Sequence, residues 1–246
     1  MRVNPNQYWI VKPISGSQGK GIFITKNFQE INFNRDFGSM PPMIASHYID
    51  NPLLINGLKF DLRIYVAVTS FYPLRIYVYE EGLTRFATTK YERAAGTSAD
   101  LNNKEGKYTH LTNYSLNKFN KKGFVQNTSA DQDKQGSKWS LSALRELLRE
   151  NGIDDKAVFA KINDVIIKTL ISVEPIMTQA HSQYVPHRTN CFQLFGFDVL
   201  IDERLNPWLL EINLSPSLAC DSPLDQKIKG SLVTDLLNLV GVVNKQ

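Results

Sequence analysis

The sequence predicts an α+β fold in which an antiparallel sheet is flanked by helices. Two runs rich in Ile, Val and Tyr, LKFDLRIYVAVTS and PLRIYVYEEGLTRFAT, are typical of long adjacent strands. Helical patterns are concentrated in the second half of the chain, and strands and helices do not alternate regularly. The lack of a regular βαβ order argues against a Rossmann fold.

The composition is that of a globular protein, with 42% hydrophobic residues among 246. No apolar run reaches the roughly 18 residues that span a bilayer, so no membrane partner is expected. The net charge of +4 suits an anionic partner, or only an ordinary basic surface. The sequence shows no dense Lys/Arg face, so a nucleic-acid partner is not expected. Two cysteines in the whole chain favour a reduced, cytoplasmic setting.

The first half of the chain predicts strands. QYWIVKP and GIFITKN are two short strands around a Gly/Ser loop, and PPMIASHYID is a third. The two long strands follow, joined by FYP. Residues from about 91 to 138 are polar and irregular, and a loop of this length indicates a functional or mobile segment.

The second half of the chain predicts helices around one hairpin. WSLSALRELLREN forms a helix, and a second helix runs from about 155 to 180 with a kink at Pro175. The hairpin consists of CFQLFGFDVLI and PWLLEINL. A last helix runs from Pro223 to about Val243, because Ser222 is a good N-cap and Pro suits the first helical position.

The apolar run PWLLEINLSPSL is interrupted by an acid and an amide. Pairing Ile201 with Trp208 puts Asp198 opposite Glu211, and Asn213 shares the face of Glu211. Facing Cβ atoms lie roughly 4.5–5.5 Å apart, where two carboxylates repel each other and are costly to desolvate. A hard cation, Mg²⁺ before Zn²⁺, would offset this cost. The alternative is that Lys or Arg pairs with the acids.

The glycine-rich stretch KPISGSQGKGIFI indicates a loop that approaches phosphate. It lacks the P-loop pattern GxxxxGK[ST], because Ile14 stands where the first Gly is needed. A strand follows it rather than a helix, so a flexible hairpin flap fits better, with Lys12 and Lys20 supplying charge. A plain Gly/Ser hairpin is the alternative.

The strand LKFDLRIYV places Lys59, Asp61 and Arg63 on one face, and Arg85 lies near the end of the next strand. An exposed strand face or ordinary salt bridges would give the same pattern. The glycine flap, the cationic strand and the acidic hairpin together predict a site for a nucleotide with Mg²⁺.

Taken together, these stretches resemble the tubulin tyrosine ligase-like family, which has an ATP-grasp fold. The matching pieces, in family order, are WIVKPISGSQGKGIFI, LKFDLRIYVAVTS, YEEGLTRFAT, HLTNYSLNK, GSKWS and GFDVLIDERLNPWLLEINLSPSL. NYSLNK and LEINLSPSLACDSPLDQKIK are most similar to the polyglutamylase branch. The resemblance implies a partial central ATP-grasp subdomain, with flap and hinge, over residues 1–50. It implies a C-terminal catalytic subdomain over 51–246, with the N-terminal part of the usual fold missing.

The resemblance implies ATP and Mg²⁺ as cofactors and assigns residues to them. Tyr48 and Ile49 would bind adenine through their backbone, although Ser46 stands where the family usually has Gln. The residues that would contact ATP are Lys12, Gln18, Gly19, Lys20, Tyr48, Ile49, Lys59, Asp61, Thr112 and Asn113. Those that would hold Mg²⁺ are Asp198, Glu211 and Asn213.

The resemblance also assigns residues to the substrates. Lys59, Arg63 and Arg85 would act in catalysis, with Arg63 orienting the acceptor. The residues that would hold donor glutamate are Arg85, Tyr114, Ser115, Lys138 and Lys229. This set suits a ligand with two carboxylates, because cations and hydroxyls are its natural partners.

The function that the resemblance implies is ATP-dependent carboxylate–amine ligation. Free L-glutamate would be added, through an acylphosphate, to glutamate side chains in the acidic C-terminal tails of tubulin. A tubulin glycylase, a tubulin tyrosine ligase, or a truncated inactive fragment acting only as a binding module are the alternatives. A monomer is expected, in the cytoplasm and on the cytoskeleton, including the cilium, flagellum or basal body.

Overall fold

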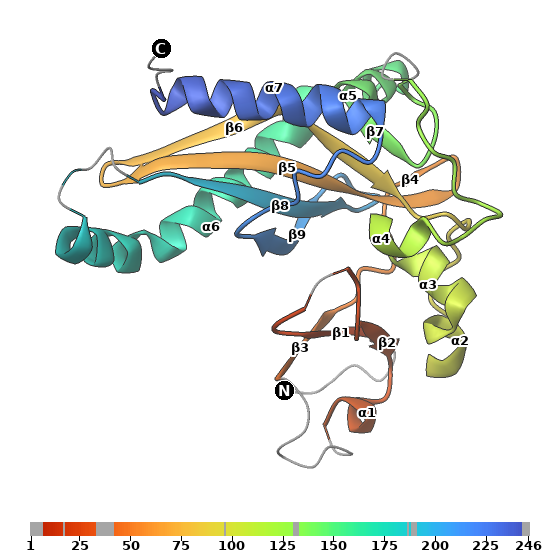
Figure 1. The fold of residues 1–246 in the computed structure, drawn as a ribbon. Helices are drawn as coiled ribbons and strands as arrows, with labels where there is room; N and C mark the ends of the chain where they lie inside the picture. Colours follow the sequence, from red (N-terminus) through yellow and green to blue (C-terminus); the bar gives the residue numbers. More distant parts are fainter. Residues whose placement is uncertain are drawn as a thin grey trace. The chain divides into compact units, whose positions relative to one another are not determined.

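The computed structural model consists of two compact units, each formed by two segments of the chain (Figure 1). Unit 1 comprises Met1–Phe60 and Phe86–Phe124, and unit 2 comprises Asp61–Arg85 and Val125–Gln246. The subdomains predicted from the sequence, 1–50 and 51–246, differ from these units in that each is one continuous segment of the chain. The structure describes residues 7–16, 18–32, 42–95, 97–129, 133–185, 187 and 191–242.

The first segment of unit 1 forms a three-stranded antiparallel sheet. Its strands are β1 (Trp9–Pro13), β2 (Phe23–Thr25) and β3 (Met43–His47), in the order β2-β1-β3. All three correspond to strands predicted from the sequence. A short helix, α1 (Phe28–Asn32), follows β2, and a two-residue strand, β4 (Leu54–Ile55), pairs with the residues that begin the first long strand.

The second segment of unit 1 contains three short helices, so the prediction of irregular structure is wrong here. They are α2 (Ser98–Asn102), α3 (Lys104–His110) and α4 (Tyr114–Asn117). The side chains of Thr97 and Asn103 cap α2 and α3. Helices this short contain too few turns to show an apolar period, and their capping residues resemble ordinary loop residues.

Unit 2 is built on the two predicted long strands, β5 (Leu58–Phe71) and β6 (Leu74–Phe86), whose outermost residues 58–60 and 86 belong to unit 1. The strand order is β7-β6-β5-β8-β9. The added strands are β7 (Lys138–Ser140), β8 (Gln193–Ile201) and β9 (Pro207–Asn213). The predicted hairpin is confirmed as β8 and β9, whereas β7 was not predicted.

The helices of unit 2 are α5 (Leu141–Glu150), α6 (Asp155–Tyr184) and α7 (Pro223–Leu239), as predicted apart from their ends. α7 lies along one face of the sheet (Figure 1), and its apolar side chains pack against β5 and β6. Its predicted N-cap is confirmed, because Ser222 Oγ accepts a hydrogen bond from the main-chain N–H of Asp225. The kink at Pro175 stays a prediction. No helix within the described ranges is long and apolar enough to cross a membrane.

The hairpin contains a β-bulge that corrects the predicted register. Ile201 pairs with the residue before Trp208, so the predicted pairing near the turn is wrong by one residue. The register shifts beside Asp198, where Leu210 is an extra residue in β9. Asp198 therefore pairs with Glu211, as predicted. The prediction assumed one regular register along the whole hairpin. That register is correct on the Asp198 side of the bulge and wrong only on the turn side, so the predicted pair is still found.

Candidate functional site

One face of the unit 2 sheet changes from apolar to charged along its length. Tyr65 of β5 and Leu83 of β6 pack beneath α7. Residues two and four positions away lie on the same face, so Arg63, Asp61 and Arg85 continue it. Asp61 is only 3% exposed. The alternative of an exposed strand face is therefore wrong for this stretch.

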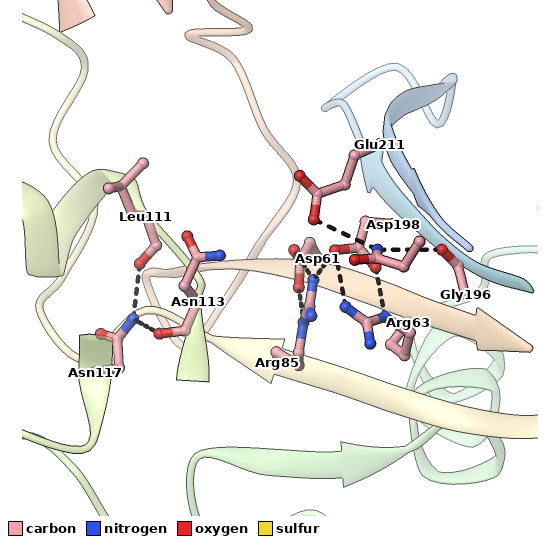
Figure 2. Close-up of polar contacts among 10 residues, drawn as sticks. Asp61, Arg63, Arg85, Leu111, Asn113, Asn117, Gly196, Asp198 and Glu211 are labelled. Carbon is pink, nitrogen blue, oxygen red and sulfur yellow. Dashed lines mark hydrogen bonds and ion pairs between the residues drawn. The ribbon is translucent and has the colours of Figure 1, made fainter. Parts of the chain in front are cut away.

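Two arginines and two aspartates form an ion-pair network on this face (Figure 2), and all of them except Arg63, which is half-buried, are buried. Arg85 donates to Asp61 through Nε at 2.8 Å and Nη2 at 2.5 Å, and Nη2 also donates to Asp198 Oδ2 at 2.7 Å. Arg63 donates to Asp198 through Nε at 2.5 Å and Nη2 at 3.1 Å. Asp198 thus pairs with arginine, the alternative that the sequence left open.

The network shifts the pKa values of Arg85 and Asp198. Burial alone would lower the pKa of Arg85, but attraction by Asp198 and Asp61 raises it well above its usual value. Burial alone would raise the pKa of Asp198, but Arg85 and Arg63 lower it to about 2. The aspartate is therefore ionised at every pH where the protein would act.

Acid is expected to destabilise the fold through Asp198. A folded pKa of about 2, below the ordinary 3.8, gives stabilisation that is complete above about pH 4. It is lost as the pH falls through about 2, and amounts to about 2 kcal/mol. Urea unfolding measured from about pH 5 to about pH 2 should show a steeper loss in the wild type than in Asp198→Asn. Equal slopes would contradict the lowered pKa.

Glycine at position 196 lets Arg63 reach Asp198. A Cβ there would lie 2.8 Å from Pro216 Cβ and 3.1 Å from Arg63 Cδ. The arginine side chain therefore crosses β8 in the space that a larger residue would occupy. Any side chain at this position would displace the guanidinium from Asp198, because Pro216 blocks relaxation on one side.

Glu211 and Asn213 lie on β9 beside this network. Glu211 is exposed, and Asn213 pairs with Gly196. The Asn213 amide donates from Nδ2 to Gly196 O at 3.2 Å and to Glu211 Oε1 at 3.4 Å. Its nitrogen is thus engaged, and Oδ1 is the oxygen that the amide offers to a cation.

Two predicted donor-binding lysines meet on one buried aspartate. Lys138 of β7 lies 2.6 Å from Asp225 Oδ2, and Lys229, one turn along α7, lies 2.9 Å from Oδ1. Ser222 Oγ also donates to Asp225 Oδ2 at 2.9 Å. Burial alone would raise the pKa of Asp225, but Lys138 and Lys229 lower it. Two ammonium groups thus face one buried carboxylate, and the charge of Asp221 also acts on Lys138.

In unit 1, the glycine loop lies against the segment that follows α3. A Cβ on Gly19, whose φ is 73°, would lie 3.1 Å from Asn113 Oδ1. Ser115 Oγ donates to Gln18 O at 3.4 Å. The structure therefore brings together Gln18, Gly19 and Asn113, which were predicted to bind ATP. It puts Ser115, predicted to bind the donor, in the same place.

Asn117, which was not predicted, holds this segment in place (Figure 2). Its Nδ2 donates to Leu111 O at 2.8 Å and to Asn113 O at 3.1 Å, while Oδ1 accepts from Thr88 N and Thr88 Oγ1. The residue is 1% exposed. Its position four residues after Asn113, on the same helical face, is a signal that could have identified it.

Lys59 lies in a buried aromatic cluster of unit 1. Its Nζ donates to Tyr48 Oη at 3.0 Å, and Tyr48 Oη also lies 3.0 Å from His110 Nδ1. The main-chain N–H of Tyr48 donates to Tyr8 O at 2.9 Å. That N–H is therefore engaged in extending the sheet, which leaves the carbonyl as the backbone group of Tyr48 for an adenine contact.

The other predicted residues are spread over unit 1. Lys20 is exposed in the glycine loop, and Tyr114 packs edge-on against Phe124 at 5.6 Å between ring centroids. The remaining predicted residues of this unit are Lys12, half-buried on β1, Ile49, half-buried after β3, and Thr112, buried after α3. Sequence reasoning missed His110 and the role of Asp225. Only Asp225 gave a signal, its spacing of four from Lys229.

Comparison with known proteins identifies relatives over nearly the whole chain. The model of the tubulin-tyrosine ligase family matches residues 1–246. The chain is 48% identical over 236 residues to tubulin polyglutamylase TTLL5 of Homo sapiens, covering 96% of this chain and 17% of the relative. It is 45% identical over 238 residues to tubulin monoglutamylase TTLL4 of Mus musculus, covering 96% and 19%. It is 45% identical over 246 residues to tubulin polyglutamylase TTLL6 of Mus musculus, covering 99% and 28%.

Proposed function

Because the chain belongs to the tubulin-tyrosine ligase family, we propose that it is an ATP-dependent ligase that adds glutamate to tubulin. The relatives named above are tubulin glutamylases, which supports glutamate as the donor and the tubulin tail as the acceptor. The chain spans only 17–28% of the length of these relatives, so the activity of the whole protein is part of this proposal. Cytoskeletal association follows from the proposed acceptor.

The observation that carries the proposal is the acidic end of the β8–β9 hairpin. Asp198 faces Glu211, and Asn213 follows on the same strand. Two carboxylates and an amide oxygen are hard donors of the kind Mg²⁺ prefers. Among the described residues, no cluster of three or more His, Cys, Asp or Glu could hold a metal, and the proposed ligand set has the amide oxygen of Asn213 as its third donor.

Acids outnumber arginines among the five charged side chains around the β8–β9 acidic pair. Asp61, Asp198 and Glu211 bring three negative charges, while Arg63 and Arg85 bring two positive ones. The arginines thus bring one charge fewer than the three acids, and a cation at Asp198 and Glu211 would add positive charge at the acidic pair. When bound, Mg²⁺ would supply charge neutralisation to the phosphates of ATP.

ATP is a substrate of the proposed reaction. The acceptor carboxylate takes the γ-phosphoryl group, giving an acylphosphate and ADP. The donor amine then attacks the acyl carbon, phosphate leaves, and the nitrogen loses a proton as the amide forms. No protein nucleophile is needed, so the chain's residues act by binding, orientation and charge.

The chain's residues divide between these roles. In unit 1, Lys59 and the glycine loop are proposed to bind ATP, because an ammonium and turns with positive φ suit phosphate. In unit 2, Lys138 and Lys229 are proposed to bind the side-chain carboxylate of the donor. Glycine and tyrosine lack that second carboxylate, so two lysines gathered at Asp225 favour glutamate over the donors of a glycylase or tyrosine ligase.

Mass spectrometry of tubulin tails tests the proposal. Tubulin is incubated with the protein, Mg-ATP and an equal mixture of glutamate, glycine and tyrosine. We expect glutamate to be added by the wild type and not by Glu211→Gln, which keeps the size of the side chain and removes its charge.

Each other outcome contradicts a defined part of the proposal. Added glycine or tyrosine would keep the ligase and overturn the donor. Equal glutamate addition by Glu211→Gln would overturn the metal role. Absence of any addition would favour a binding module without activity.

A further inference from the structure

The ammonium of Lys59 is held by a directional hydrogen-bond chain. Lys59 is 6% exposed, and its Nζ lies 3.0 Å from Tyr48 Oη and 4.4 Å from the centroid of the same ring. An ammonium can only donate, so Tyr48 Oη must accept from Lys59. The hydroxyl proton of Tyr48 must then point to a different acceptor.

His110 is the better acceptor for that proton. Its Nδ1 lies 3.0 Å from Tyr48 Oη, whereas the hydroxyl of Tyr91 lies 3.5 Å away. The Tyr91 hydroxyl donates to Asp50 O at 2.9 Å, so it can only accept from Tyr48, and its longer separation makes it the weaker of the two acceptors. The shorter contact therefore sets the direction of the chain, from Lys59 to Tyr48 to His110.

The surroundings hold the imidazole in the required state. Its ring stands edge-on to Tyr48 and Tyr91, with centroid distances of 5.8 Å and 5.5 Å. Burial and the charge of Lys59 lower the pKa of His110 to about 4, so the ring is neutral near pH 7. Burial also raises the pKa of Tyr48 well above its usual value, so the phenol keeps its proton. A neutral imidazole can accept at Nδ1 only when its hydrogen is on Nε2.

We propose that His110 is a positioning residue for Lys59 and acts through the hydroxyl of Tyr48. The rotamer freedom of a lysine side chain is large, and fixing it before the ligand binds lowers the entropic cost of binding. The phosphate-binding role of Lys59 rests on the proposed function. His110 itself touches no ligand in this proposal.

Nucleotide affinity tests the positioning role. Removing one net hydrogen bond should raise the Kd for Mg-ATP by roughly 3- to 10-fold in Tyr48→Phe and His110→Leu, measured by calorimetry on the full chain. His110→Asn should stay within about 2-fold of wild type, because its Oδ1 takes the place of Nδ1 as acceptor. Tyr79→Phe, which loses a hydroxyl bonded to Asp235 on the surface of unit 2, is the matched control and should leave the Kd unchanged.

The tautomer of His110 tests the direction of the chain without nucleotide. Nitrogen NMR of the labelled protein near neutral pH should show a neutral ring with its hydrogen on Nε2. A hydrogen on Nδ1 would overturn the inference, as would equal Kd values for His110→Leu and His110→Asn. A wild type that binds no Mg-ATP would overturn the proposed function instead, and the NMR result would then decide the hydrogen-bond chain alone.

Discussion

Replacing Arg85 with Met is expected to lower the free energy of unfolding by roughly 3–5 kcal/mol. Arg85 pairs with both Asp61 and Asp198, and both carboxylates are buried. Met fills similar volume but leaves Asp61 without its bidentate partner inside the sheet. Urea unfolding followed by circular dichroism measures the change.

Arg63→Met is the matched comparison and should cost less. Its removal affects Asp198 alone, and Asp198 keeps its contact with Arg85. Adding Asp61→Asn to Arg85→Met should recover part of the lost unfolding free energy, because it removes the buried negative charge that Arg85→Met leaves without its partner. An Arg85→Met variant no less stable than Arg63→Met would contradict the central place of Arg85 in the network.

Replacing Lys138 with Met is expected to raise the KM for glutamate by roughly 10- to 150-fold, with a smaller effect on the KM for ATP. The substitution removes one of the two cations on Asp225, and with it one of the two proposed partners of the donor side-chain carboxylate. The buried aspartate keeps Lys229 and Ser222, so the fold should survive. The measurement is the rate of labelled glutamate incorporation into tubulin as each substrate is varied.

Lys134→Met is the control for this prediction. Lys134 pairs with Glu146 and Glu150, which are more than half exposed, so its loss should change neither KM. The preference for glutamate over glycine should also fall in Lys138→Met, because glycine has no side-chain carboxylate that could bind Lys138. An unchanged glutamate KM would show that the donor binds elsewhere.

Local signals were sufficient to predict most of the fold. The strands of the β8–β9 hairpin, the two long strands and the N-cap at Ser222 depend on patterns within a few residues. The helices α2 to α4 were missed because they are too short to show an apolar period, and α2 and α3 begin instead at side-chain caps. The bulge in β9 was missed because no glycine or proline marks its position.

The candidate site was less predictable, because its contacts join distant parts of the chain. Arg63 and Asp198 are 135 residues apart, and Lys138 and Asp225 are 87 apart. A strand pattern places such residues on a face but does not choose their partners. Asp225 fits the general preference for an acid at a helix N-terminus, so its sequence context gives no reason to expect Lys138. The proposed roles of the lysines depended on resemblance alone.

The bulge at Leu210 has a consequence for how freely the hairpin can vary. On the turn side, β8 and β9 pair in one phase, and beyond the bulge they pair in another. A substitution or a change of loop length near the turn can therefore be absorbed at the bulge before it reaches Asp198 and Glu211. The sequence and length of the turn can therefore vary during evolution without changing how Asp198 pairs with Glu211.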